Sequence, residues 1–205
     1  MTDTHPDTDQ LLRRVAEGDQ NAAQDLLARH RPRLRRMVTV HLDTRISARV
    51  DPSDVVQEAL AEAFQRLPSY ASEPAVSFYP WLRQIAWQRL VKLHRHHLKA
   101  ARRSVHREQD RDWSLSDESI GQLAERFVSE RTDPGRKAIR QEMRQRVRTA
   151  LDQLLPADRE LLVMRYLEHL TIREIAETLD LTQASIKMRQ ARALERLQKA
   201  LASDP

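Results

Sequence analysis

The chain has 205 residues, of which 40% are hydrophobic and 32% charged, with 3 Gly and no Cys. Without Cys it has no disulfide framework, thiolate metal site or cysteine nucleophile, and without a GxGxxG or GxxxxGK[ST] pattern it lacks the glycine-based phosphate cradles of nucleotide enzymes. No apolar run approaches the ~18 residues that span a bilayer, and the acidic N-terminus MTDTHPDTDQ does not resemble a signal peptide. We therefore expect a soluble, cytoplasmic protein.

Charge is distributed unevenly along the chain. Residues 74–107 carry 8 basic and no acidic side chains, whereas residues 108–135 carry 3 basic and 8 acidic ones and end in the helix breaker Pro134-Gly135. Residues 136–205 are basic again, with a net charge of +4. A basic strip, an acidic tether and a second basic module favour a polyanion bound at two places. The alternative for any single charge run is a solvated helix face.

Apolar residues recur at steps of three and four nearly everywhere, which predicts helices, two or three of them before residue 45. Asp51 is a candidate N-cap, Pro52 suits the first helical position, and the helix that begins there should run to about Leu67. Its outward face carries Asp54, Gln57 and Glu58. On an exposed helix such a set is more typical of a docking surface or a solvated acid pair than of a catalytic site.

A loop bracketed by Pro68 and Pro80, unusually aromatic for this chain, should precede a helix from about Trp81 to Ala100. At 100° per residue, one helix face is apolar and should pack on the domain; it carries Leu82, Ile85, Ala86, Leu90 and Leu93. The opposite face and its edges combine amides, indoles and cations: Trp81, Gln84, Trp87, Gln88, Lys92 and Arg95. Amides can contact base edges, indoles can stack on unpaired bases and cations neutralise phosphates, so this mixture suits partly opened DNA. Alternatively, the two tryptophans are core residues.

The histidine-rich end of this helix does not predict a metal site. His94, His96 and His97 form no i, i+4 pair, and the basic strip supplies no acidic ligand. No arrangement of nucleophile and base can be inferred elsewhere in the sequence either. We expect neither a metal ion, nor a cofactor, nor a catalytic residue.

Near the C-terminus the pattern predicts a helix-turn-helix. Thr171 can cap a short helix, with Glu174 completing a capping box, and Thr182 can cap a second helix whose Ile186 returns to the core. The outward face of the second helix presents Ser185, Met188 and Arg192, flanked by Lys187 and Arg189. We expect the first three to enter the DNA major groove. The flanking cations, with Thr171, should hold phosphates.

Three segments in this order resemble the small, two-domain extracytoplasmic-function (ECF) group of bacterial RNA polymerase sigma factors. They are DPSDVVQEALAEAFQRL, similar to sigma region 2.2; SFYPWLRQIAWQRL, similar to regions 2.3 and 2.4; and LPADRELLVMRYLEHLTIREIAETLDLTQASIKMRQARALERL, similar to region 4.2. The resemblance implies an all-α chain of two small helical domains joined by a flexible acidic linker, the second a helix-turn-helix domain. We expect region 2 in residues 1–107, the linker in 108–137 and region 4 in 138–205.

The resemblance also implies roles for the residues singled out above and for the loop aromatics Phe78 and Tyr79. Asp54, Gln57 and Glu58 would bind core RNA polymerase. The minus-ten element would be recognised and melted by Phe78, Tyr79, Trp81, Gln84, Trp87, Gln88, Lys92 and Arg95. The minus-35 element would be bound by Thr171, Thr182, Ser185, Lys187, Met188, Arg189 and Arg192. The chain departs from the family pattern at Gln88, where Asn is usual, at Trp87, where a basic residue is commoner, and at Asp180, where Gly is common.

The resemblance implies a protein that is not itself an enzyme and whose partners are core RNA polymerase and promoter DNA. It also allows an anti-sigma factor, which the sequence does not identify. The alternative is a helix-turn-helix DNA-binding regulator that acts without polymerase. The aromatic loop that leads into a tryptophan-bearing basic helix argues against this alternative.

Overall fold

The computed structural model describes residues 6–47, 49–101, 115–127 and 137–202. All regular structure in these residues is helical, which confirms the all-α expectation. The helices are α1 (Pro6–Ala16), α2 (Gln20–His41), α3 (Thr44–Ser47), α4 (Pro52–Ser72), α5 (Phe78–Ala101), α6 (Asp117–Phe127), α7 (Lys137–Asp152), α8 (Pro156–Tyr166), α9 (Ile172–Leu179) and α10 (Gln183–Ala202). None of the described helices combines the length and the apolar character needed to cross a bilayer.

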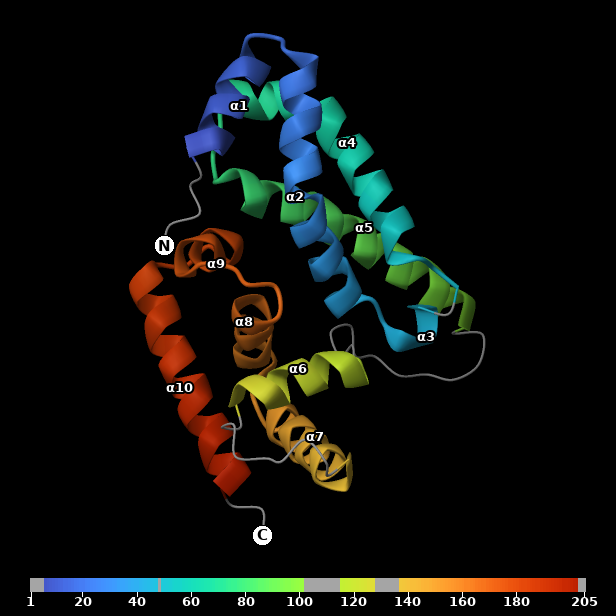
Figure 1. Ribbon diagram of the computed structural model, residues 1–205, viewed down its shortest axis with the longest axis vertical. Coiled ribbons are helices and arrows are strands. Elements are labelled where there is room, and N and C mark those ends of the chain that lie inside the picture. Colours follow the sequence, from blue (N-terminus) through green and yellow to red (C-terminus); the bar gives the residue numbers. More distant parts are fainter. Residues whose placement is uncertain (1–5, 48, 102–114, 128–136, 203–205) are drawn as a thin grey trace.

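The first five helices form one bundle, in which α2, α4 and α5 pack against one another and α1 closes one end (Figure 1). Its core consists of the apolar stripes that the periodicity predicted. The largest side chains that are fully buried there are Leu26, Leu34, Met37, Leu67, Leu82 and Leu90. The expected inward face of α5 is confirmed, because Leu82, Ala86 and Leu90 are all 0% exposed.

Helices α6 to α10 surround a second core, which is the helix-turn-helix half of the molecule (Figure 1). Its α6 falls inside the range predicted as a linker, and Ile120 and Leu123 of that helix are buried against α7 and its neighbours. The two-domain architecture is confirmed, while the boundaries of the domains stay a prediction.

The end of α4 and the start of α5 differ from the expected positions. The chain remains helical past Pro68 to Ser72, although a proline removes one helical hydrogen bond, and α5 already begins at Phe78. Leu67 and Tyr70 lie in the first core at 0% and 7% exposure, and burial of the last turn of α4 outweighs the lost bond. The predicted loop therefore shrinks to a few residues, closed by a hydrogen bond of 2.7 Å from the Tyr70 hydroxyl to the Val76 carbonyl.

The two halves are packed against each other. Val40 of α2 and Tyr79 of α5 belong to the second core, although they are part of the first bundle. α9 lies against the N-terminal part of α5 (Figure 1). The sequence does not predict this contact between the halves.

Candidate nucleic-acid interface

The helix-turn-helix is built as its local chemistry predicts. The Glu174 amide donates to Thr171 Oγ1 at 3.2 Å and the Thr171 amide to Glu174 Oε2 at 2.8 Å, so the capping box is confirmed. Asp180 adopts the left-handed conformation at φ 54° and ψ 49°, which Asp tolerates better than most residues. The Leu181 amide then reaches back to the Ala176 carbonyl at 3.0 Å and closes the turn between the helices.

The outward face of α10 is accessible. The Ser185 amide donates to Thr182 Oγ1 at 3.1 Å, which confirms the cap, while Ile186 is fully buried and anchors the helix. Ser185, Lys187, Met188 and Arg192 are exposed, as expected for a face that enters a groove. Arg192 Nη2 lies 3.4 Å from Met188 Sδ, so the two side chains that we expect to contact bases form one patch.

The flanking residues of this surface are less free than expected. Arg189 is half-buried and lies 3.8 Å from Asp158 of α8. The Thr171 hydroxyl is occupied by the capping box. The phosphate-binding roles of both residues stay predictions.

The polar face of α5 is also accessible. Gln84, Gln88, Lys92 and Arg95 are exposed, while the apolar face behind them is buried. Amides and cations therefore lie along one side of a rigid helix, which is the arrangement that combined recognition of bases and phosphates requires.

The aromatic residues assigned to the minus-ten element are more buried than the polar ones. Phe78 and Tyr79 are 4% and 2% exposed, Phe78 in the first core and Tyr79 in the second. Trp81 is half-buried and stacks on Tyr70 with ring centroids 4.4 Å apart. Trp87 is half-buried and lies nearly perpendicular to the His41 ring, with the two ring centroids 5.1 Å apart. In this conformation Phe78 and Tyr79 are not accessible to DNA, and the tryptophans offer only part of their rings.

The surface assigned to the polymerase lies on α4. Asp51 caps the helix by accepting from the Ser53 amide at 2.7 Å, as expected. Asp54, Gln57 and Glu58 are all exposed on its outward face. Glu58 also accepts a hydrogen bond of 3.3 Å from Arg89 of α5, so this face of α4 is joined to the basic helix.

A buried ionic cluster joins the two halves, and it is the part of the site that the sequence reasoning missed. Arg83 of α5 is 3% exposed and donates to both oxygens of Glu168, at 2.8 and 2.7 Å; Glu168 lies between α8 and α9 and is 0% exposed. His41 Nε2 lies 2.8 Å from the same carboxylate. Burial alone would raise the pKa of Glu168, but Arg83 and His41 hold it well below its usual range.

One sequence signal could have pointed to this contact. Tyr79, Arg83 and Trp87 are spaced four residues apart and therefore share one face of α5, a second face distinct from the apolar stripe. In the structure this face packs on the helix-turn-helix half, where Tyr79 and Arg83 are buried.

Oxygen and nitrogen atoms of His41, Glu160 and Glu168 lie within 4.8 Å of one another, which is close enough for a shared metal ion. Arg83 already donates to both of these carboxylates, at 3.3 Å to Glu160 and 2.7 Å to Glu168. Its guanidinium supplies the positive charge that a metal ion would bring, so the donor set is built around an arginine.

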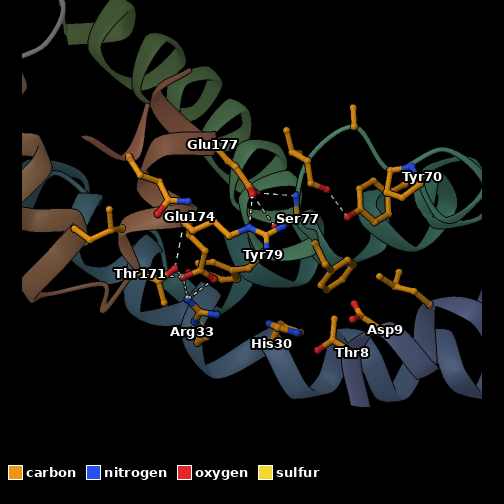
Figure 2. A pocket seen from close by; sticks show the side chains of 18 of the residues that line it. Thr8, Asp9, His30, Arg33, Tyr70, Ser77, Tyr79, Thr171, Glu174 and Glu177 are labelled. Carbon is orange, nitrogen blue, oxygen red and sulfur yellow. Dashed lines mark hydrogen bonds and ion pairs between the residues drawn. The ribbon is translucent and has the colours of Figure 1, made fainter. Parts of the chain in front are cut away.

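A cavity of about 570 Å³ lies where α1, α2 and the start of α5 face α9. Figure 2 shows that Arg33 and Ser77 point across it toward Glu174 and Glu177. Arg33 Nη2 donates to the two oxygens of Glu174 at 2.9 and 3.0 Å. The Ser77 amide and hydroxyl donate to Glu177 at 2.8 and 2.9 Å.

The fold and its surfaces define a two-domain, helical DNA-binding protein whose second domain is a helix-turn-helix. Residues 26–103 match the family model "Sigma-70 region 2", and residues 150–199 match "Sigma-70, region 4". The chain is 31% identical over 190 residues to the ECF RNA polymerase sigma-E factor of Escherichia coli (strain K12), covering 92% of this chain and 91% of that protein.

Two solved structures share the fold. CnrH in complex with the cytosolic domain of CnrY superimposes with a TM-score of 0.56 at 22% identity, over 97% of this chain and 99% of that one. The sigma factor RpoE from Bartonella quintana, in complex with the anti-sigma factor NepR, does so with a TM-score of 0.51 at 20% identity, over 91% and 100%.

The chain belongs to the ECF group of RNA polymerase sigma factors, which confirms the resemblance seen in the sequence. Its function is that of a sigma factor: it binds core RNA polymerase and directs initiation at specific promoters. A regulator that acts without polymerase is not favoured, because region 2 is present as well as the helix-turn-helix.

Proposed function

We propose that this chain acts in the cytoplasm and that three of its surfaces each bind one partner during initiation. The α4 face binds core polymerase, the polar face of α5 binds the minus-ten element, and the outward face of α10 binds the minus-35 element. The chain positions the polymerase at a specific promoter, while the polymerase catalyses RNA synthesis. The observation that carries this proposal is that the polar residues of all three faces are exposed on helices whose opposite faces are buried.

The polymerase surface can be tested by charge reversal. Asp54→Lys with Glu58→Lys should weaken binding to core polymerase, because an acidic face is expected to meet a basic one. Glu17→Lys with Asp25→Lys is the matched control, since these exposed acids change the net charge equally but lie elsewhere on the bundle. Association and dissociation rates should be measured at two salt concentrations, because exposed charges act mainly on association. If both double variants bind core polymerase with equal affinity, the α4 face is not the polymerase-binding surface.

The minus-ten surface can be tested by comparing duplex and premelted promoters. Trp87→Ala should reduce open complex more on a duplex than on a premelted bubble if the indole assists melting, and an aromatic that stacks on a base is worth ~1–3 kcal/mol. Gln88→Ala should instead change base preference on both templates. Circular dichroism of each variant controls for loss of packing, because Trp87 also contacts His41. Equal activity of Trp87→Ala and the parent on duplex DNA would leave the indole a structural role.

Variants of the minus-35 surface can distinguish contacts to bases from contacts to phosphates. Arg192→Ala should cost ~1–3 kcal/mol and relax the preference at one promoter position. Lys187→Ala should weaken all sequences alike and lower the salt slope by about one. If Arg192→Ala weakens every upstream sequence equally, Arg192 belongs with the phosphate contacts.

An anti-sigma factor is a further partner that we propose for this chain. The support is that the RpoE structure of the same fold was solved with an anti-sigma factor. Retention of a specific protein from the host on the immobilised chain, in competition with core polymerase, would test this.

A further inference from the structure

A charged network crosses the contact between α4 and α5, and it includes residues that the three proposed surfaces leave unassigned. Glu62 of α4 accepts from Arg89 Nε of α5 at 2.6 Å and pairs with Arg66 Nη2 of its own helix at 2.6 Å. Arg89 Nη1 also donates to Glu58 at 3.3 Å. The network therefore connects an acid of the proposed polymerase surface to a cation next to the proposed minus-ten surface.

The two carboxylates hold Arg89 to different degrees. The Glu62 side chain is 17% exposed, and each of its two oxygens contacts an arginine at 2.6 Å. The Glu58 side chain is 66% exposed and lies farther from the guanidinium, so water and salt screen this pair more strongly. If Glu58 found another partner, Arg89 would stay bound to Glu62 and some of its donors would become available.

Arg89 lies at the edge of the α5 face that we assign to DNA. It directly follows Gln88 and precedes Lys92 by three residues, and both of these neighbours are exposed. A guanidinium has five N–H donors and can bind a phosphate through two parallel hydrogen bonds. Because Glu62 already holds Nε, Arg89 loses less side-chain freedom when its remaining donors bind a phosphate.

This network is separate from the contact between the halves. Arg89 follows Arg83 by six residues, which places the two side chains about 120° apart around α5 at 3.6 residues per turn. Arg83 contacts the helix-turn-helix half, whereas Arg89 contacts α4. The role of Arg89 can therefore be measured independently of the packing of the two halves.

We propose that Arg89 is a phosphate-binding residue of the minus-ten surface and that Glu58 occupies its Nη donors until polymerase pairs with that carboxylate. On polymerase binding, Arg89 keeps its bond to Glu62 and donates from its Nη atoms to a backbone phosphate of the minus-ten strand. Polymerase on α4 and DNA on α5 thereby strengthen each other's binding, as linkage requires. The inference rests on the proposed function for the partner that pairs with Glu58.

The isolated chain tests the phosphate contact without polymerase. The probe is a single-stranded oligonucleotide that carries the minus-ten sequence upstream of a mapped start site. Glu58→Gln should raise the affinity for this probe several-fold and steepen its salt slope by about 0.7, the value for one more phosphate contact on a single strand. The same change in an Arg89→Gln background should have neither effect. Glu73→Gln is the matched control, because it removes one exposed charge at the C-terminal cap of the same helix.

The complex with core polymerase tests the same contact on a promoter. Arg89→Gln should lower the salt slope of promoter binding by roughly 0.7 to 0.9, the range for one contact to single-stranded or duplex DNA. Arg66→Gln is the matched control, because it removes the other arginine on Glu62, and it should leave the slope unchanged. Arg89→Lys should retain the slope, since it retains the charge, whereas a slope lost through misfolding would not be restored by lysine.

Binding to core polymerase tests the exchange of partners. Arg89→Gln should bind core polymerase at least as tightly as the parent, because Glu58 loses an internal competitor for the polymerase. Weaker binding would assign Arg89 to holding Glu58 in place and would overturn the exchange.

Two further results would contradict the proposal. Equal salt slopes of the parent and Arg89→Gln complexes would overturn the phosphate contact, and a gain from Glu58→Gln that persists without Arg89 would overturn the exchange. If Glu58→Gln leaves core polymerase binding unchanged, the α4 assignment in the proposed function fails. The oligonucleotide measurements would still decide whether Arg89 binds phosphate.

Discussion

Arg83 and Glu168 offer a direct measure of what holds the two halves together. Arg83→Met leaves a fully buried carboxylate whose remaining side-chain partner among the described residues is His41, and breaking a buried pair by removing one partner costs about 3–5 kcal/mol. Glu168→Leu leaves the guanidinium with Glu160, at 3.3 Å, as its remaining carboxylate partner among the described residues. The double variant replaces both charges by apolar groups and should be close to neutral. We therefore expect a coupling energy of several kcal/mol between the two positions. This energy cannot exceed the free energy with which the halves close, because opening exposes both residues to water.

Urea denaturation at neutral pH, followed by tryptophan fluorescence and circular dichroism, measures this double-mutant cycle. Fluorescence is informative because the Arg83 guanidinium lies 5.4 Å from the Trp87 ring centroid. If both signals are lost in one cooperative transition, the pair stabilises the whole fold. If fluorescence changes at a lower urea concentration than circular dichroism, the pair stabilises the contact between the halves. Additivity of the single variants within about 0.5 kcal/mol would refute the reasoning.

Three further outcomes follow from the packing and the titratable groups. Thr171→Val should destabilise the helix-turn-helix by about 1 kcal/mol in thermal unfolding, because it removes the hydroxyl that accepts from the Glu174 amide; an unchanged midpoint would contradict this. Tyr79→Phe should be neutral or stabilising by denaturant titration, because the Tyr79 hydroxyl is buried without a hydrogen-bond partner in the structure described, and a large loss would reveal a missed partner. Acid should open the halves, because the pKa of Glu168 is lowered in the closed state. The ionised carboxylate therefore favours closure at pH values above the usual pKa range of glutamate. Below that range the free energy of closure weakens by up to about 1.4 kcal/mol per pH unit. Glu168→Gln should flatten this profile when the distance between spin labels on Ser69→Cys of α4 and Ala184→Cys of α10, both exposed, is followed against pH, and an equal slope in the variant would assign the effect to other groups.

Local chemistry was sufficient to predict much of the helix-turn-helix. The capping box of Thr171 and Glu174 and the left-handed Asp180 depend on residues within a few positions of one another. The apolar stripe of α5 follows in the same way from helical periodicity. These features form within a single helix or turn and need no knowledge of the rest of the molecule.

The contact between the halves could not be predicted in that way. Arg83 and Glu168 are 85 residues apart in sequence, and nothing near either residue specifies the other as its partner. The same limit applies to Tyr79, to which the resemblance assigns a contact with DNA but which lies in the second core, because α5 has two packed faces. Continuation of α4 past Pro68 likewise depends on burial of Tyr70, a tertiary effect that outweighs the local rule.

Reconstituted initiation tests the central claim most directly. Core RNA polymerase alone and with the full chain would be incubated with a library of genomic fragments, and the 5′ ends of the transcripts would be mapped. The account predicts defined start sites only in the presence of the chain, preceded by two shared elements near positions minus-ten and minus-35, with Arg192→Ala relaxing the upstream one. Specific binding of duplex fragments without any polymerase-dependent start site would contradict it.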